Sequence, residues 1–172
     1  LLRTLELRGL VERFARLRLG VPGMRGSAPA LLEAALVLTR MVRTFVPEAA
    51  SVAGRLRREA AQLRQEATGR SVAMAAKLLA ERLHTRLGLR GGDDDEQLDI
   101  EQVAIDRVLA ERVGAPVTLS LLYILVARWA GLSAAGVALH DHFLVRLHGP
   151  RPVLVDPFHG GRTVTKSDCA RY

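Results

Sequence analysis

The chain has 172 residues, of which 49% are hydrophobic, so it is long enough and apolar enough to form one globular domain. Its single cysteine excludes an internal disulfide framework and suits a reducing cytoplasm. Neither a membrane-spanning apolar run nor an export signal is recognisable, so we expect a cytoplasmic protein without a membrane anchor.

The formal net charge of +7 raises the question of nucleic-acid binding. Much of the basic excess is arginine in segments rich in Arg, Ala and Leu, which is typical of the solvated outer faces of amphipathic helices. A nucleic-acid surface usually adds aromatic side chains to such a patch, and aromatics make up only 4% of this chain. The sequence therefore argues against a nucleic-acid partner, despite the charge.

Residues 1–29 are expected to form a separate N-terminal part. Within 4–19, apolar residues recur at helical spacing and predict an amphipathic helix with a basic outer side. This helix is expected to pack on the domain or on a second copy, as in a homodimer, rather than on a membrane surface. Residues 20–29 are rich in glycine and proline and are expected to be a flexible joint.

Four helices are predicted between this joint and residue 110. They cover residues 30–45, 48–67, 71–87 and 99–109. Pro47 forces a new helix start, Ser71 can cap the third of these helices, and Gly88 can end it. Met74 is among the apolar residues expected on the buried side of that helix. The acidic run 93–96 lacks the ligand spacing of a calcium loop, so it is expected to be a solvated loop.

Residues 116–130 are predicted to form the central helix of the fold. Pro116 suits the first helical position, because the amide hydrogen that proline lacks has no helical acceptor there. The segment is apolar nearly all round, which a surface helix could not tolerate. We therefore expect a buried helix that ends at Gly131.

Strands are predicted beyond this helix. Apolar and polar residues alternate over 137–148, which indicates one strand, and Gly149-Pro150 is a turn signal before a second strand at 153–155. A hairpin centred near Gly149 would place opposite each other positions whose numbers sum to about 298. His142 and Asp156 would then lie side by side on one face of the sheet.

Four histidines raise the question of a zinc site. His140 and His142 point the same way on the predicted strand, and His148 and His159 lie further along the chain. The single cysteine is distant in sequence and no HExxH helix is present, so no metal is expected. His142 with Asp156 is the better pair, either as a structural hydrogen bond or as the remnant of a catalytic dyad.

The C-terminal part resembles a known family in four motifs. They are Gly-Ala-Pro-Val-Thr-Leu at 114–119, His-Phe-Leu-Val-Arg at 142–146, Asp-Pro-Phe-His-Gly-Gly at 156–161 and Asp168-Cys169. With these motifs the chain resembles the SirB-type branch of the transglutaminase-like superfamily, which has a papain-type fold. The resemblance implies a SirB-type domain over residues 30–172 that is truncated at its C-terminus. Two departures are Asp141, where the family usually has glycine, and Gln102-Val103, which replaces a typical Asn-Ser pair.

The resemblance implies an α+β fold, with a helical N-terminal half and a central helix packed on a small antiparallel sheet. In the wider superfamily a helix N-terminus presents a cysteine to a histidine and an aspartate on adjacent strands. His142 and Asp156 match the histidine and the aspartate, and Pro116 matches the cysteine. Proline at this position is usual in the SirB-type branch. Because proline has no reactive side chain, the ordinary mechanism lacks its nucleophile.

Three functions are therefore open. The first, which the resemblance favours, is a non-catalytic, protein-binding or regulatory module without a cofactor, since related domains occur in substrate-recognition subunits of ubiquitin ligases. The second is a hydrolase or acyltransferase with a relocated nucleophile, for which Thr118, Ser120 and Cys169 are the candidates. Those three residues and His140 are the expected pocket lining. The third is a basic nucleic-acid accessory protein.

Overall fold

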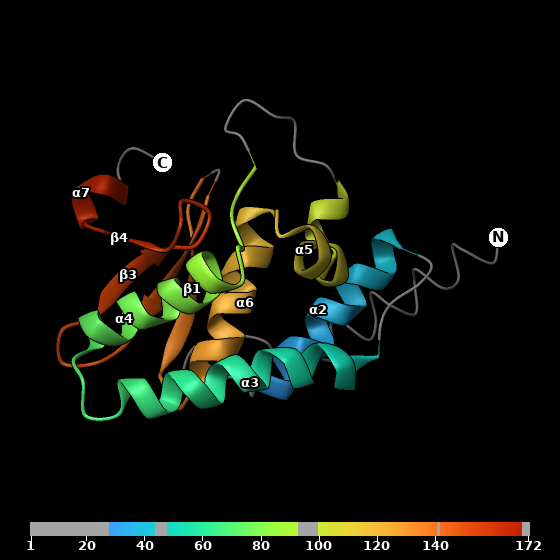
Figure 1. The fold of residues 1–172 in the computed structure, drawn as a ribbon. Helices are drawn as coiled ribbons and strands as arrows, with labels where there is room; N and C mark the ends of the chain where they lie inside the picture. The colour runs from blue at the N-terminus through green and yellow to red at the C-terminus, as the bar shows by residue number, and fades with distance from the viewer. Residues whose placement is uncertain (1–27, 44–47, 93–99, 141, 170–172) are drawn as a thin grey trace.

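The computed structural model describes residues 28–43, 48–92, 100–140 and 142–169 of the chain (Figure 1). The expectations for residues 4–19 and for the acidic run 93–96 lie outside these ranges, as does Asp141. None of the helices within the described ranges is long and apolar enough to cross a membrane.

The described residues form helices packed beside one small antiparallel sheet (Figure 1). The helical elements are α2 (Ala28–Val42), α3 (Ala49–Ala67), α4 (Val72–Ala80), η1 (Glu81–Arg86), η2 (Ile100–Val103), α5 (Ile105–Glu111), α6 (Pro116–Trp129) and α7 (Lys166–Cys169). The strands are β1 (Ala134–Ala138), β2 (Phe143–Leu147), β3 (Val153–Asp156) and β4 (Arg162–Val164), in the order β1-β2-β3-β4. This combination confirms the predicted α+β class.

Helix α6 is the buried centre of the domain, as predicted. Ala115 has an extended backbone, with φ −62° and ψ 152°, and Pro116 takes the first helical position. The side chains on nearly every side of α6 are buried, because α2 and α3 pack on one side of it and β1 and β2 on the other (Figure 1). The helix ends before Gly131, whose φ of +86° suits glycine.

The strand predicted over residues 137–148 is in fact a hairpin. Strands β1 and β2 pair in antiparallel fashion, and the Leu139 N–H donates to the His142 carbonyl oxygen at 2.9 Å across the turn between them. Val137 lies opposite Leu144, so it shares a face of the sheet with Leu144 and not with Val145. The apolar–polar alternation of the sequence therefore does not follow one face through the turn, and it does not reveal the reversal. His140 consequently lies in the turn, and not on one strand with His142 as predicted.

The predicted register of the next hairpin is wrong by two residues. Val145 lies opposite Val155, which moves the centre of the hairpin one position beyond Gly149. Because side chains alternate with a period of two, a shift of two residues leaves every side chain on its predicted face. His142 and Asp156 thus share a face, but they meet diagonally rather than directly opposite each other.

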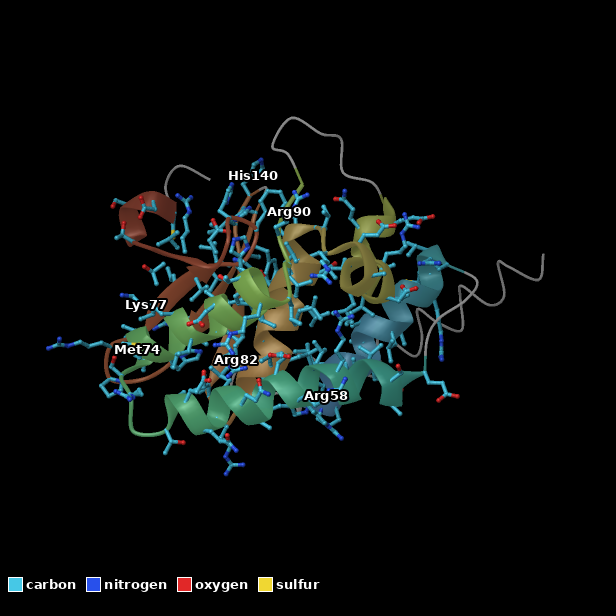
Figure 2. The ribbon with its side chains drawn as sticks, viewed as in Figure 1. Arg58, Met74, Lys77, Arg82, Arg90 and His140 are labelled. Carbon is cyan, nitrogen blue, oxygen red and sulfur yellow. The ribbon has the colours of Figure 1, made fainter. Side chains whose placement is uncertain are left out.

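The helix predicted over residues 71–87 has two parts. The Ser71 Oγ accepts a hydrogen bond from the Met74 N–H at 3.2 Å and so caps α4, as predicted. After Ala80 the chain continues as the π-helix η1, and Gly88, with φ +73°, follows it. The prediction that Met74 is buried is wrong, because its residue is 42% exposed and its side chain points away from the core (Figure 2).

Arg82 in the π-helix η1 is a buried cation that joins η1 to α3 (Figure 2). Its residue is only 1% exposed, and its guanidinium contacts Glu59, Gln62 and Glu66, which lie on one face of α3. The Nε atom has no hydrogen-bond partner among the described residues. Removing one partner of a buried ion pair is costly, because the remaining charges lose their compensation.

We therefore expect Arg82→Ala to lower the free energy of unfolding by about 3 kcal/mol. Arg86→Ala is the matched control, since Arg86 is a half-exposed arginine of the same π-helix that pairs with Glu81. Its loss of stability should be much smaller than that of Arg82→Ala, because an exposed ion pair contributes little. Urea unfolding followed by circular dichroism measures both values, and equal losses would contradict a structural role for the buried cation.

Candidate functional site

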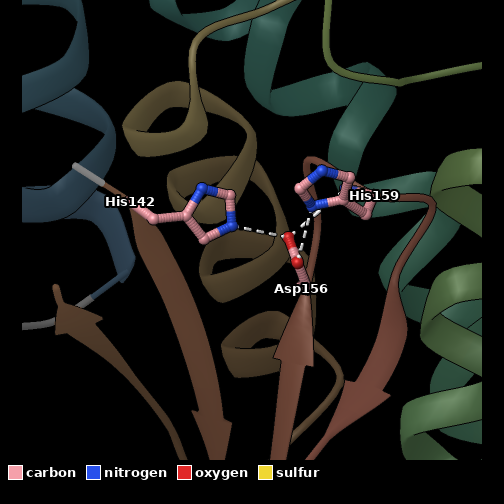
Figure 3. A group of neighbouring side chains, drawn as sticks. All are labelled: His142, Asp156 and His159. Carbon is pink, nitrogen blue, oxygen red and sulfur yellow. Dashed lines mark hydrogen bonds and ion pairs between the residues drawn. The ribbon is translucent and has the colours of Figure 1, made fainter. Parts of the chain in front are cut away.

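Asp156, the last residue of β3, is the centre of the candidate site (Figure 3). Its side chain has no exposed surface. Oδ1 lies 2.9 Å from the His142 Nε2, and Oδ2 lies 2.8 Å from the His159 Nδ1. The backbone N–H of His159 also donates to Oδ1 at 3.3 Å. A carboxylate removed from water is thereby supplied with hydrogen-bonding groups from two sides.

The position of His142 depends on β2 and α6. His142 directly precedes β2, and the next residue, Phe143, accepts a hydrogen bond at its carbonyl oxygen from the Ser120 Oγ at 3.0 Å. Ser120 is fully buried and lies one turn after Pro116 at the start of α6. This bond ties the beginning of β2 to the N-terminal half of the central helix, so His142 is held beside that half.

The position of His159 depends on the glycines of the turn between β3 and β4. Gly160 and Gly161 have φ values of +72° and +73°, a left-handed conformation that favours glycine. The Gly161 N–H donates to the Asp156 carbonyl oxygen at 2.8 Å and closes the turn. A Cβ atom on Gly161 would lie only 2.5 Å from the Cβ of Ala80, so glycine is also required by packing.

An aromatic ring covers one side of the site, and another side is open to solvent. The Phe158 ring stands edge-on to both imidazoles, with centroid distances of 5.8 Å to His142 and 5.2 Å to His159. The side chain of His142 is 7% exposed, whereas that of His159 is 32% exposed. Arg162 is 55% exposed, and its Nε lies 3.6 Å from the Asp156 Oδ2. Solvent therefore reaches the site past His159 and Arg162.

Tyr123 in α6 lies behind the site and is fully buried. Its hydroxyl oxygen has no hydrogen-bond partner among the described residues. Burial, and secondly the negative charge of Asp156, raise the pKa of Tyr123 well above its ordinary value. The neutral phenol is thus favoured in the folded state.

This raised pKa predicts a loss of stability at high pH. The folded state holds the Tyr123 proton more tightly than the unfolded state. The contribution of Tyr123 to the free energy of unfolding is therefore complete below pH 10 and declines as pH rises above it. Between pH 8 and pH 11 the ionisation of this one group should lower the free energy of unfolding by on the order of 1 kcal/mol. The Tyr123→Phe variant should not show this loss. At pH 8 its free energy of unfolding should be close to that of the native protein, since the hydroxyl has no hydrogen-bond partner to lose among the described residues. Urea unfolding at the two pH values tests this, and an identical pH response in both proteins would contradict it.

The candidate nucleophiles make hydrogen bonds to backbone carbonyl groups. The Thr118 hydroxyl donates to the Val103 carbonyl oxygen at 3.2 Å, and the Ser120 hydroxyl is bound to Phe143. Cys169, the last residue of α7, lies beyond the end of β4, and its Sγ donates to the carbonyl oxygen of Thr165, just before α7, at 3.3 Å (Figure 1). Their use as relocated nucleophiles stays a prediction.

The remaining pocket candidate, His140, is exposed in the turn before β2 (Figure 2). His159 is a second partner of Asp156, beside His142, which the sequence alone does not predict. The signal was present, because a histidine three residues after an aspartate and followed by two glycines can turn back onto that aspartate. In the sequence alone, His159 stands out only as one of the histidines considered for a zinc site.

The comparisons with known proteins assign the chain to a family. A sequence model of the transglutaminase-like superfamily matches residues 50–172. As this is more than half of the chain, the protein belongs to the transglutaminase-like superfamily.

Two relatives belong to the group called UPF0162 protein. One from Xylella fastidiosa is 41% identical over 81 residues, which cover 46% of this chain and 28% of the relative. One from Vibrio cholerae is 34% identical over 71 residues, which cover 40% of this chain and 26% of the relative. The chain thus matches less than a third of the length of these curated relatives. No solved structure matches the chain.

Proposed function

We propose that this chain is a SirB-type transglutaminase-like domain that performs no transglutaminase chemistry and serves as a protein-binding, regulatory module. One observation carries the proposal. The position that the resemblance aligns with the family's cysteine is Pro116, at the start of α6, whereas His142 and Asp156 are in hydrogen-bond contact. An imidazole–carboxylate pair without a nucleophile cannot begin acyl transfer.

The nearby hydroxyls support this proposal. A nucleophile must reach its general base by a hydrogen bond, and activation removes its proton. Thr118 and Ser120 are both buried and donate their protons to the carbonyl groups of other segments. Recruiting Ser120 would break its bond to Phe143, which fixes the residue next to His142. The hydroxyls therefore stabilise the site in the form seen here.

The open side of the site supports binding. The partly exposed imidazole of His159 and the exposed guanidinium of Arg162 supply nitrogen donors at its rim. Such donors match the carbonyl and carboxylate oxygens of a peptide segment, and an arginine can hold a carboxylate through two parallel hydrogen bonds. A protein segment with an acidic side chain or a free carboxyl end is the partner that this rim fits best.

Thiol labelling tests the non-catalytic part of the proposal. Cys169 is the only cysteine, and a thiol without an activating imidazole should react slowly with iodoacetamide. We expect rates within about twofold of each other in the native protein and in His142→Ala. Labelling in urea gives the intrinsic rate of the unfolded thiol as a reference. Fast labelling that disappears in His142→Ala would instead favour the hydrolase or acyltransferase with a relocated nucleophile.

Affinity capture from extracts of the source cells tests the binding part. The bait is the full chain. With Arg162→Ala the amount of captured partner should fall at least tenfold, since a charged hydrogen bond at an interface contributes about 1.4 kcal/mol or more. Arg58→Ala is the matched control, because Arg58 is an exposed arginine on α3 (Figure 2). Quantitative mass spectrometry measures the capture. If no protein is lost selectively with Arg162→Ala, the proposed rim is not the binding surface.

A further inference from the structure

We propose that His142, Asp156 and His159 form a binding site for a divalent transition-metal ion of the Zn²⁺ type. Each residue offers one ligand atom, and these atoms lie within 4.8 Å of one another. His142 directly precedes β2, Asp156 ends β3 and His159 lies in the turn after it, and both imidazoles point at the Asp156 carboxylate (Figure 3). This inference does not depend on the protein-binding role proposed above.

The spacing of the ligand atoms is close to that of a metal centre. Bonds of about 2.0–2.1 Å to zinc place two ligands of a tetrahedral site about 3.3 Å apart. The two nitrogen–oxygen distances observed are 2.9 Å and 2.8 Å. Because these distances are to two different oxygens of Asp156, loading the site requires one imidazole to shift towards the oxygen that binds the ion, and each nitrogen–oxygen pair to open by about half an ångström. The His159 side chain can make this adjustment, because it is partly exposed and lies in a turn.

The chemistry of the donors selects the class of ion. Two imidazole nitrogens and one carboxylate oxygen suit Zn²⁺ and its neighbours, whereas Mg²⁺ and Ca²⁺ prefer oxygen ligands. Three protein ligands with one open side leave a coordination position for water or for a bound group. The open side here is the one next to His159, and Phe158 shields the imidazoles with its ring.

The site has one feature that opposes a cation. Arg162 lies 3.6 Å from the Asp156 Oδ2, and its positive charge competes with an ion for the same carboxylate. Its side chain is more exposed than buried, so it can swing into solvent when an ion enters. Removing the positive charge of Arg162 should therefore strengthen cation binding, because like charges repel.

Metal titration of the tag-free, chelator-treated chain tests the proposal. We expect one equivalent of Co²⁺ to bind, with visible d–d absorption bands that Zn²⁺ abolishes and Mg²⁺ leaves unchanged. His159→Ala should weaken Co²⁺ binding at least tenfold, and Arg162→Ala should strengthen it severalfold. His148→Ala is the matched control, because it removes an exposed histidine just after the opposite end of β2 and should not change the affinity.

The melting temperature separates metal loss from misfolding. In EDTA, His159→Ala should unfold cooperatively but melt below the native chain, because the buried Asp156 loses one hydrogen-bond partner. Zn²⁺ should raise the melting temperature of the native chain, of His148→Ala and of Arg162→Ala, but not that of His159→Ala. Absence of one-equivalent uptake, or uptake that persists unchanged in both His142→Ala and His159→Ala, overturns the metal site. If His142→Ala does not fold, His159→Ala alone decides. None of these results bears on partner capture, so the two proposals fail separately.

Discussion

The buried carboxylate of Asp156 is the constraint on which the C-terminal half of this domain depends. A carboxylate without exposed surface is costly unless hydrogen-bonding groups replace the water it has lost. Here the replacements are the two imidazoles of His142 and His159 and the backbone N–H of His159. Because these groups come from the residue before β2 and from the turn after β3, the hydrogen bonds of this one side chain hold three segments together.

The helical part holds this arrangement in place. Ser120 of α6 binds the carbonyl group next to His142, and η1 lies against the other side of the site, where the His84 ring comes within 3.2 Å of the Cβ position of Gly160. Arg82 in turn anchors η1 to α3 through buried ion pairs. Segments of π-helix often occur at functional sites. In this protein the π-helix supports the glycine turn that carries His159.

The same donor atoms allow two states of the site, and one excludes the other. When the ring nitrogens of His142 and His159 donate protons to Asp156, their lone pairs cannot bind a metal ion at those atoms. When an ion is bound, it takes the place of both protons and holds the carboxylate directly. Membership of the transglutaminase-like superfamily is compatible with either state, since a fold supports more than one chemistry and the site decides among them.

The sequence by itself determined the buried helix α6, the α+β class and the shared face of His142 and Asp156, because hydrophobic periodicity and strand alternation are local properties. It did not determine where the strand reverses before His142, since apolar and polar residues alternate across the turn although Val137 and Val145 lie on opposite faces of the sheet. Nor did it determine the exposure of Met74 or the approach of His159. These depend on which neighbours pack against each side chain, and packing between distant segments is decided only when the whole chain folds.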